Sequence, residues 1–486
     1  MNIETSTIDN EKSESVVTET NKKCDETSKN ENKKGILYKL GNVSDKTISL
    51  LATLAMFVLL FAPALMSVID MFKQSIDFTL AYYIDIIQVW AFPIVSVIVF
   101  IIYLLVFLQI RNRGIDLLTI VKKNPVFVIF SISVVLMVIS QITNDTWTVE
   151  HSFYMTVVGE SFDMEITYFI FILFGATQVR KEAHKRFLLR SQLFISILVV
   201  IAAFVLWHAQ DESRFFMDWY VRLSGIFTNG NYFGYYLAIS IPIAASTFVY
   251  EKQIVWKIIS GVSFIVNVCA LSINHARGTI LGVSFAIAFI ILSHLIIERK
   301  INWQTLVIVP VFILFMIVPN KIYGDSEPYE RPSIGADIAN FIEGNEAAGS
   351  DRLKLWRQTV NIIKDYKWLG IGFEGIAVKD VAFEIDNGRP HNEFLQYALF
   401  HGIPMAITYF VGCLGVFIRA LRKRKIIDGA TLVCLSGALG YLINSFFGLT
   451  VFSTAMYLFV FMGMGYVRDD LNMTTKEKEL ENVESI

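Results

Sequence analysis

Long apolar segments alternate with short polar connections from residue 47 to residue 467. Most of these segments approach the roughly 20 residues that an α-helix needs to cross a bilayer. The pattern predicts an all-α polytopic integral membrane protein with about twelve transmembrane helices. A count of eleven or thirteen spans also fits the sequence, because the segment at 164–179 is short and the segment at 304–319 contains Pro310. The predicted spans are 47–69, 86–108, 125–143, 164–179, 191–207, 231–250, 256–273, 279–297, 304–319, 396–418, 428–446 and 450–467.

Composition points to the same class. Of the 486 residues, 54% are hydrophobic and only 18% are charged, and the mean hydropathy is +0.52. A soluble domain carries about 25% charged residues. The net charge of −2 indicates no particular partner, and we expect no binding of nucleic acid. The four cysteines, Cys24, Cys269, Cys413 and Cys434, show neither metal-binding nor redox spacing.

Charge is sorted between the two sets of connections. The basic connections are 109–124, 180–190, those around Lys252 and Lys257 and around Arg299 and Lys300, and 419–425. They alternate with acidic or weakly charged connections at 70–85, 144–163, 208–230, 274–278, 320–395 and 447–449. The positive-inside rule then places the basic connections and both termini in the cytoplasm. We expect a multi-pass protein of the inner, or cytoplasmic, membrane.

The same pattern divides the chain into five parts. Residues 1–45 are polar and predict a disordered cytoplasmic tail, and residues 468–486 predict a second one. Residues 46–319 hold the first nine predicted spans and residues 396–467 the last three. Between them, residues 320–395 form one large extracytoplasmic loop. A loop of that length without helices of its own is improbable, so we expect it to contain helices and to be functional.

One stretch of this loop carries helical periodicity. Apolar residues recur at helical spacing at Leu353, Trp356, Val360 and Ile363. This predicts an amphipathic helix with Arg352 in its first turn. Gly370 and Gly372 then predict a turn or an extended segment.

Three arginines on the predicted outer side are candidates for binding phosphate. Arg277 opens an apolar helix after a very short turn, Arg222 begins the run RLSGIFTNGNYFGYYL, and Arg352 opens the loop helix. A guanidinium matches pairs of phosphate oxygens, and helix amides add to its attraction for an anion. The plain alternative is that arginines at a bilayer edge extend to lipid headgroups. Together the three predict a clamp for a diphosphate.

His391 is the candidate general base. It precedes Asn392 and Glu393, where an apolar helix is predicted to begin. A histidine with an unperturbed pKa of about 6.5 suits proton transfer near neutral pH. The alternative is that it is a helix cap or a surface residue. Glu393 is placed to orient His391 or to neutralise an arginine, whereas His275 and His401 are weaker candidates. No nucleotide loop, metal ligand set or outer acidic pair stands out, so we expect no metal and no cofactor.

These residues carry a family resemblance. The run RLSGIFTNGNYFGYYL, the short turn with Arg277, then DRLKLWRQTVNIIKDYKWLGIGFEG and PHNEFLQYALFHGIP resemble the O-antigen ligase and O-antigen polymerase family. The resemblance covers about residues 220–410. It implies a polytopic glycosyltransferase with a GT-C-like core and one large extracytoplasmic loop.

The resemblance also implies roles for individual residues. Arg277 and Arg352 match arginines that hold the diphosphate of an undecaprenyl-linked glycan, and His391 matches the base that activates the acceptor hydroxyl without metal. The chain departs from the usual pattern at three places: Asn229-Gly230-Asn231, Tyr366-Lys367-Trp368, and His275-Ala276 before Arg277. The departures bear on subfamily and substrate more than on class.

The sequence therefore predicts a metal-independent glycosyltransferase of cell-envelope polysaccharide biosynthesis, acting on the outer face of the membrane. Its partners would be an undecaprenyl-diphosphate-linked glycan, an acceptor glycan, the bilayer and a chain-length regulator. Frequent Ile, Lys, Asn and Phe suggest an AT-rich, Gram-positive source, which favours polymerisation of capsular, exopolysaccharide or O-antigen repeat units. An O-antigen-type ligase is the alternative. A flippase for lipid-linked glycans is the alternative from another class, and it would need ionisable residues at mid-membrane.

Overall fold

A computed structural model describes residues 47, 49–61, 97, 101, 104, 124–144, 162–179, 181–209, 223–227, 229–299, 302–323, 334–346, 348–349, 351–373, 389–450 and 452–467. The expected terminal tails, most of the predicted span at 86–108, and Arg222 lie outside these residues. Every regular element in the described part of the chain is a helix.

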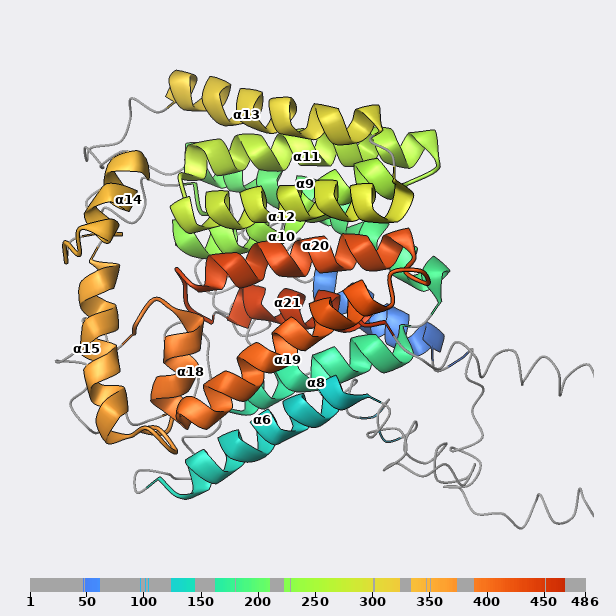
Figure 1. The fold of residues 1–486 in the computed structure, drawn as a ribbon. Helices are drawn as coiled ribbons and strands as arrows, with labels where there is room; N and C mark the ends of the chain where they lie inside the picture. The colour runs from blue at the N-terminus through green and yellow to red at the C-terminus, as the bar shows by residue number, and fades with distance from the viewer. Residues whose placement is uncertain are drawn as a thin grey trace, which may run out of the picture.

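Ten of these helices lie side by side in one bundle (Figure 1). They run alternately in opposite directions, so the bundle has two ends. We call the end at which α10 begins the site end and the other the basic end. The ten helices are α6 (Pro125–Ile142), α8 (Phe162–Gln178), α9 (Glu182–Ala209), α10 (Gly230–Tyr250), α11 (Ile254–Asn274), α12 (Arg277–Glu298), α13 (Trp303–Tyr323), α19 (Ile403–Arg422), α20 (Gly429–Ser445) and α21 (Phe452–Met464).

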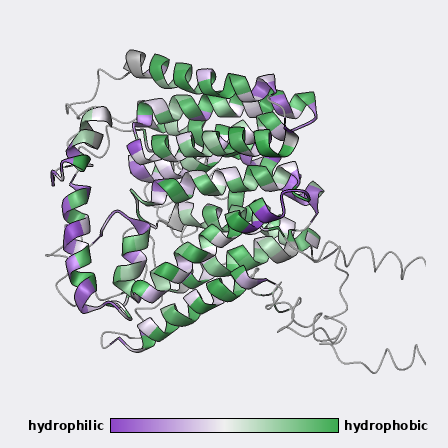
Figure 2. Cartoon of the chain, viewed as in Figure 1, coloured by the Kyte–Doolittle hydropathy of each residue, from purple (hydrophilic) through white to green (hydrophobic). Residues whose placement is uncertain are grey.

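Among the described residues, six helices are long and apolar enough to cross a membrane, and five further apolar helices are shorter. Apolar residues make up most of the bundle helices (Figure 2), and large apolar side chains lie on the outside, where Ile407 is 55% exposed and Val135 is 56% exposed. Large apolar side chains facing outward are stable when lipid surrounds them. The protein is therefore an all-helical polytopic membrane protein.

Helix α10 is the centre of the bundle. In this span 89% of the most apolar window is buried, and α10 packs against α11, α12 and α20. Glycines permit this close packing: a Cβ on Gly440 would meet the carbonyl oxygen of Ala238, and a Cβ on Gly282 would meet that of Gly440. Small residues let helix backbones approach where lipid supplies no hydrophobic drive. Near the site end, a Cβ on Gly234 of α10 would meet the side chains of Ala276 and Thr279, so the first turns of α10 and α12 also lie close together.

The predicted span at 396–418 is divided in the structure. A short helix, α18 (Glu393–His401), ends at Gly402, and α19 begins at Ile403. Gly402 has a φ of 87°, a conformation that favours glycine, and the Trp368 carbonyl lies against its Cα. The chain therefore breaks where the loop before α18 packs against it.

Two more helices cover the site end, within the segment at 320–395. Helices α14 (Ile334–Ile342) and α15 (Arg352–Asp365) run across the ends of the bundle helices (Figure 1). The predicted amphipathic helix is confirmed as α15, and Ile363 of the predicted apolar positions is buried, but the rest of the buried face differs from the predicted one. Leu355, Thr359 and Ile362 are buried, whereas Val360 is 40% exposed. The helix is rotated because it packs against α18.

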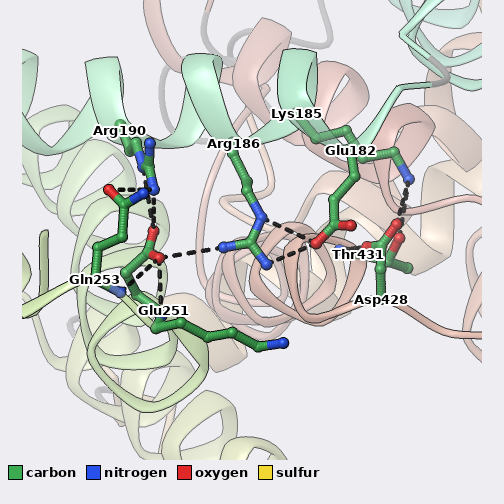
Figure 3. A network of polar contacts seen from close by, with 9 residues as sticks. Glu182, Lys185, Arg186, Arg190, Glu251, Gln253, Asp428 and Thr431 are labelled. Carbon is green, nitrogen blue, oxygen red and sulfur yellow. Dashed lines mark hydrogen bonds and ion pairs between the residues drawn. The ribbon is translucent and has the colours of Figure 1, made fainter.

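Polar contacts join three helices at the basic end (Figure 3). The Glu251 carboxylate, which follows α10, accepts hydrogen bonds from Arg186 at 3.2 Å and from Arg190 at 2.8 Å, both on α9. Lys185 donates to Thr431 of α20 at 2.9 Å. Part of the basic connection at 180–190 is thus neutralised by acceptors from α10 and α20.

Candidate functional site

The turn that joins α20 to α21, residues 446–450, is the point at which the site-end elements meet. Phe446 contacts Phe394 of α18, with ring centroids 4.5 Å apart. Phe447 lies 6.1 Å from the Trp356 ring of α15. The Leu449 amide donates to the Tyr235 hydroxyl of α10 at 2.9 Å. We call these five residues the α20–α21 turn.

Arg277 is the first residue of α12, as predicted. The turn before it is fixed by Asn274, whose amide donates to the carbonyl oxygens of Leu223 at 2.7 Å and Gly230 at 2.8 Å. The residue after it, Gly278, lies against the α20–α21 turn, because a Cβ there would be 3.0 Å from the Cβ of Phe447. The N-cap residue Ala276 makes no side-chain cap hydrogen bond, and the positive end of the α12 dipole lies at Arg277.

Arg352 begins α15 at the same end of the bundle. One of its guanidinium nitrogens donates to the Gly349 carbonyl at 2.7 Å, which holds the side chain against the preceding turn. Trp356, one helical turn further, contacts Phe447. Phe447 therefore lies between the first turns of α12 and α15, and the two predicted arginines belong to elements that meet there.

His391 is close enough to two arginines for their charges to act on it. It follows Pro390, is half-buried, and has a φ of 48°, which is left-handed backbone for a residue other than glycine. Burial, and after it the charges of Arg352 and Arg389, together lower the pKa of His391 from 6.5 to about 4. The imidazole is therefore neutral near pH 7, as a proton acceptor must be.

The two residues after His391 face the helix and its core. Asn392 is the N-cap of α18, and its side chain accepts a hydrogen bond from the Leu395 amide at 3.1 Å. Glu393 is fully buried and accepts a hydrogen bond from the Tyr409 hydroxyl at 2.6 Å. Burial raises the pKa of Glu393 to about 7, with Tyr409 opposing the rise and Glu165 adding to it. Glu393 is thus a carboxyl that holds a proton part of the time at neutral pH.

Sequence reasoning missed two residues at this site. Tyr235 carries no charge and lies inside an apolar run, yet the charges of Arg352 and Glu393 both act on its hydroxyl. Arg389 is one of several cations in the segment at 320–395 and no periodicity distinguishes it, yet its charge acts on His391, and its guanidinium lies 5.9 Å from the Phe400 ring. Burial lowers the pKa of Arg389 to about 10. The signal for Arg389 was its position two residues before His391.

Arg222, the third predicted arginine, lies outside the described residues. In the described part of the chain, no group of three or more His, Cys, Asp or Glu residues is placed to hold a metal ion. His401 and Glu165 form a buried pair, with 2.7 Å between Nε2 and Oε2. They lie in the last turn of α18 and the first turn of α8, beneath the site.

The fold and this cluster define a class: a polytopic helical membrane protein with arginines and a histidine gathered at one end of its bundle. Residues 262–410 match the family model described as O-antigen ligase, which supports an O-antigen ligase-like family. The matched residues include Arg277, Arg352 and His391. The family supports O-antigen-related glycan transfer, with lipid-linked and acceptor glycans as substrates. No curated protein matches the chain.

Proposed function

We propose that the protein is a metal-independent glycosyltransferase on the outer face of the cytoplasmic membrane. It polymerises undecaprenyl-diphosphate-linked oligosaccharide repeat units into capsular polysaccharide, exopolysaccharide or O-antigen. The observation that carries the proposal is the position of His391, within reach of the charges of Arg352 and Arg389, at the end of the bundle where α12 begins with Arg277. A dianionic leaving group and a hydroxyl acceptor need this combination of cations and a neutral base.

In the proposed reaction, Arg277, Arg352 and Arg222 bind the diphosphate of the donor. The acceptor hydroxyl oxygen attacks the anomeric carbon, the bond from that carbon to the diphosphate oxygen breaks, and undecaprenyl diphosphate leaves. The hydroxyl proton passes to His391. The arginines neutralise the charge that develops on the leaving oxygen.

Donor binding also improves the base. In the free enzyme burial and the two guanidinium charges together keep the pKa of His391 low, at about 4. A diphosphate bound to Arg352 offsets part of that positive charge and therefore raises the pKa of His391 toward neutrality. The base is most effective when its pKa lies near the working pH, so proton transfer becomes easier once the donor is bound. Asn392 supports His391 as the cap of α18, and Glu393 supports it through its bond to Tyr409.

The proposal includes the finer topology: about twelve spans, a GT-C-like core, both termini in the cytoplasm, and the segment at 320–395 as the extracytoplasmic loop. The alternation of basic and acidic connections supports this orientation. A chain-length regulator would act with the enzyme as a separate protein.

A ligase that transfers the finished lipid-linked glycan to a final acceptor is the second candidate. The description of the matched family, O-antigen ligase, favours it. Both candidates use the same donor chemistry and differ in the acceptor. The flippase alternative is less well supported, because a flippase would need ionisable residues at mid-membrane. The ionisable pair Glu165 and His401 lies instead in terminal helical turns at the site end.

The test replaces the chromosomal copy by Arg277→Ala, Arg352→Ala or His391→Ala at matched membrane abundance. The length distributions of surface polysaccharide and of undecaprenyl-linked glycan are then measured. We expect single lipid-linked repeat units to accumulate and long chains to be lost. Long lipid-linked chains that never reach a final acceptor would establish the ligase instead.

Two matched controls come from the same helices. Arg357→Ala removes an exposed arginine of α15 that pairs with Glu346 at 2.9 Å, and Arg299→Ala removes one at the far end of α12. Both variants should leave the glycan pattern unchanged. A normal pattern in all three site variants would refute the enzyme assignment and return the flippase to first place.

A further inference from the structure

The segment after α15 presents an unusual surface for a loop. Trp368 is 69% exposed and Tyr366 is 37% exposed. The Lys367 ammonium lies 6.0 Å from the centre of the Trp368 ring. We call residues 366–368 the Tyr-Lys-Trp segment. Two outward aromatic rings with a lysine between them are costly to leave in water, so the segment must face something.

The backbone of this segment is held firmly. The Ile403 amide donates to the Lys367 carbonyl at 2.9 Å. The Gly370 amide donates to the Tyr366 carbonyl at 2.8 Å, and the Ile371 amide donates to the Leu399 carbonyl at 2.9 Å. The Ser140 hydroxyl of α6 donates to the Leu369 carbonyl. The exposed rings are therefore displayed by a fixed backbone joined to α6, α18 and α19.

The surface next to Trp368 identifies its surroundings. The Trp368 carbonyl lies against Gly402, and α19 begins at the next residue. An apolar stripe continues from there down α19: Ile403 is 39% exposed, Ile407 55% and Leu414 46%. Since α19 is a candidate membrane span, this stripe faces lipid. The backbone of Trp368 lies at the N-terminal end of this stripe.

An exposed tryptophan beside a glycan-processing site could also serve as a stacking platform for a sugar ring. Continuity with the lipid-facing stripe of α19 favours the membrane, because a sugar platform would need to face the water-filled site. The chemistry of the segment fits as well. Tryptophan and tyrosine concentrate at the membrane–water interface, and lysine extends its ammonium to lipid phosphates.

We propose that the Tyr-Lys-Trp segment binds the outer headgroup layer of the bilayer and anchors the C-terminal end of α15 at that depth. Helix α15 lies across the bundle end (Figure 1), with its buried face toward the bundle and Arg357 and Lys364 on the opposite, exposed face. Its two ends therefore lie at similar depths. Arg352, at the N-terminal end, is held at the level of the headgroups.

This depth has a consequence for the proposed function, on which it rests. The phosphates of a lipid-linked donor remain at headgroup level, because the polyprenyl tail is confined to the acyl layer. The anchor fixes Arg352 where those phosphates must arrive. The Tyr-Lys-Trp segment would thus align the enzyme with its donor without touching it.

The direct test measures depth and does not depend on activity. A spin label is attached to Trp368→Cys in the full-length protein, with the four native cysteines replaced by alanine, in vesicles of phosphatidylglycerol and phosphatidylethanolamine. Power saturation compares the accessibility of the label to oxygen and to a water-soluble nickel chelate. Lys364→Cys is the control for water and Ile407→Cys is the control for the acyl layer.

We expect the label at 368 to report a depth between the two controls, at the headgroup boundary. A label at 368 that is as accessible to nickel as the label at 364 would overturn the proposal. If Trp368→Ala then also raised the KM for the acceptor glycan, the sugar-platform alternative would replace it.

An activity measurement tests the consequence separately. Trp368→Ala is compared with wild type on a polyprenyl-linked donor in vesicles and on a donor with a short, water-soluble tail. We expect a several-fold loss of kcat/KM only for the membrane-bound donor. Equal losses for both donors would contradict the alignment role, while inactivity of the wild type on both would count against the proposed function and leave the measured depth intact.

Discussion

The pH dependence of transfer should respond to a charge that makes no bond to His391. Removing the Arg389 guanidinium by Arg389→Gln keeps a polar side chain of similar length and deletes one of the two positive charges that act on the imidazole. A nearby cation disfavours the protonated imidazolium. The substitution should therefore raise the pKa of His391.

The size of the effect is bounded by the causes of the low pKa. The pKa of His391 falls from 6.5 to about 4, with burial the largest cause, Arg352 the second and Arg389 the third. Arg389 then accounts for at most one third of a fall of about 2.5, which is a rise of at most about 0.8 on its removal. At pH 4.5 the neutral fraction of His391 would fall from about three quarters to about one third.

The assay is the initial rate of glycan transfer between pH 4 and pH 8, at donor concentrations well below KM. Under that condition the acid limb of kcat/KM reports the base in the free enzyme. The His391 imidazole is lost as a base when the pH falls through its pKa, so the acid limb should move to higher pH in Arg389→Gln. Arg357→Gln, which removes an exposed arginine of α15, is the control and should leave the limb in place. If the acid limb of kcat/KM in Arg389→Gln is unchanged or moves to lower pH, the electrostatic reasoning is refuted.

Three further predictions concern the stability of the helix bundle and of its site end. Glu251→Gln should lower thermal stability in detergent by about 2 kcal/mol, because it leaves the arginines of α9 without their carboxylate. Hydrogen bonds from Arg190 and from amides hold the pKa of Glu251 below 4.5 despite burial. The stability that ionised Glu251 contributes is therefore present above pH 4.5 and is lost below it. A wild-type melting temperature that does not fall below pH 4.5 would contradict this prediction. Gly448→Ala should lower the free energy of unfolding by about 1–3 kcal/mol in the same thermal measurement, because the new Cβ meets the Tyr235 hydroxyl. An unchanged melting temperature would show that the α20–α21 turn shifts to make room for the Cβ. Asn392→Ala should lower the free energy of unfolding by about 1 kcal/mol and Asn392→Asp by much less, because only aspartate keeps the α18 cap. Equal losses of stability in the two variants would exclude the capping role.

The sequence by itself determined the class of the molecule and the ends of its important helices. Runs of apolar residues need lipid around them, and this requirement is local, so a polytopic membrane protein could be predicted from hydropathy alone. Helix starts at Arg277, Arg352 and Glu393 were also predictable, because periodicity begins there. Asn229, a residue type that often caps helices, is the N-cap of α10 and accepts a hydrogen bond from the Asn231 amide at 2.8 Å.

Only the tertiary structure decided which of these ends meet. The contact of Phe447 with Trp356 joins residues 91 positions apart, and no periodicity encodes it. The rotation of α15 that exposes Val360 depends on its packing against α18. The pKa of His391 depends on burial and on Arg352, which lies 39 residues earlier in the chain. Burial and charge proximity are properties of assembled helices, so the chemistry of His391 could be named from the sequence but its environment could not.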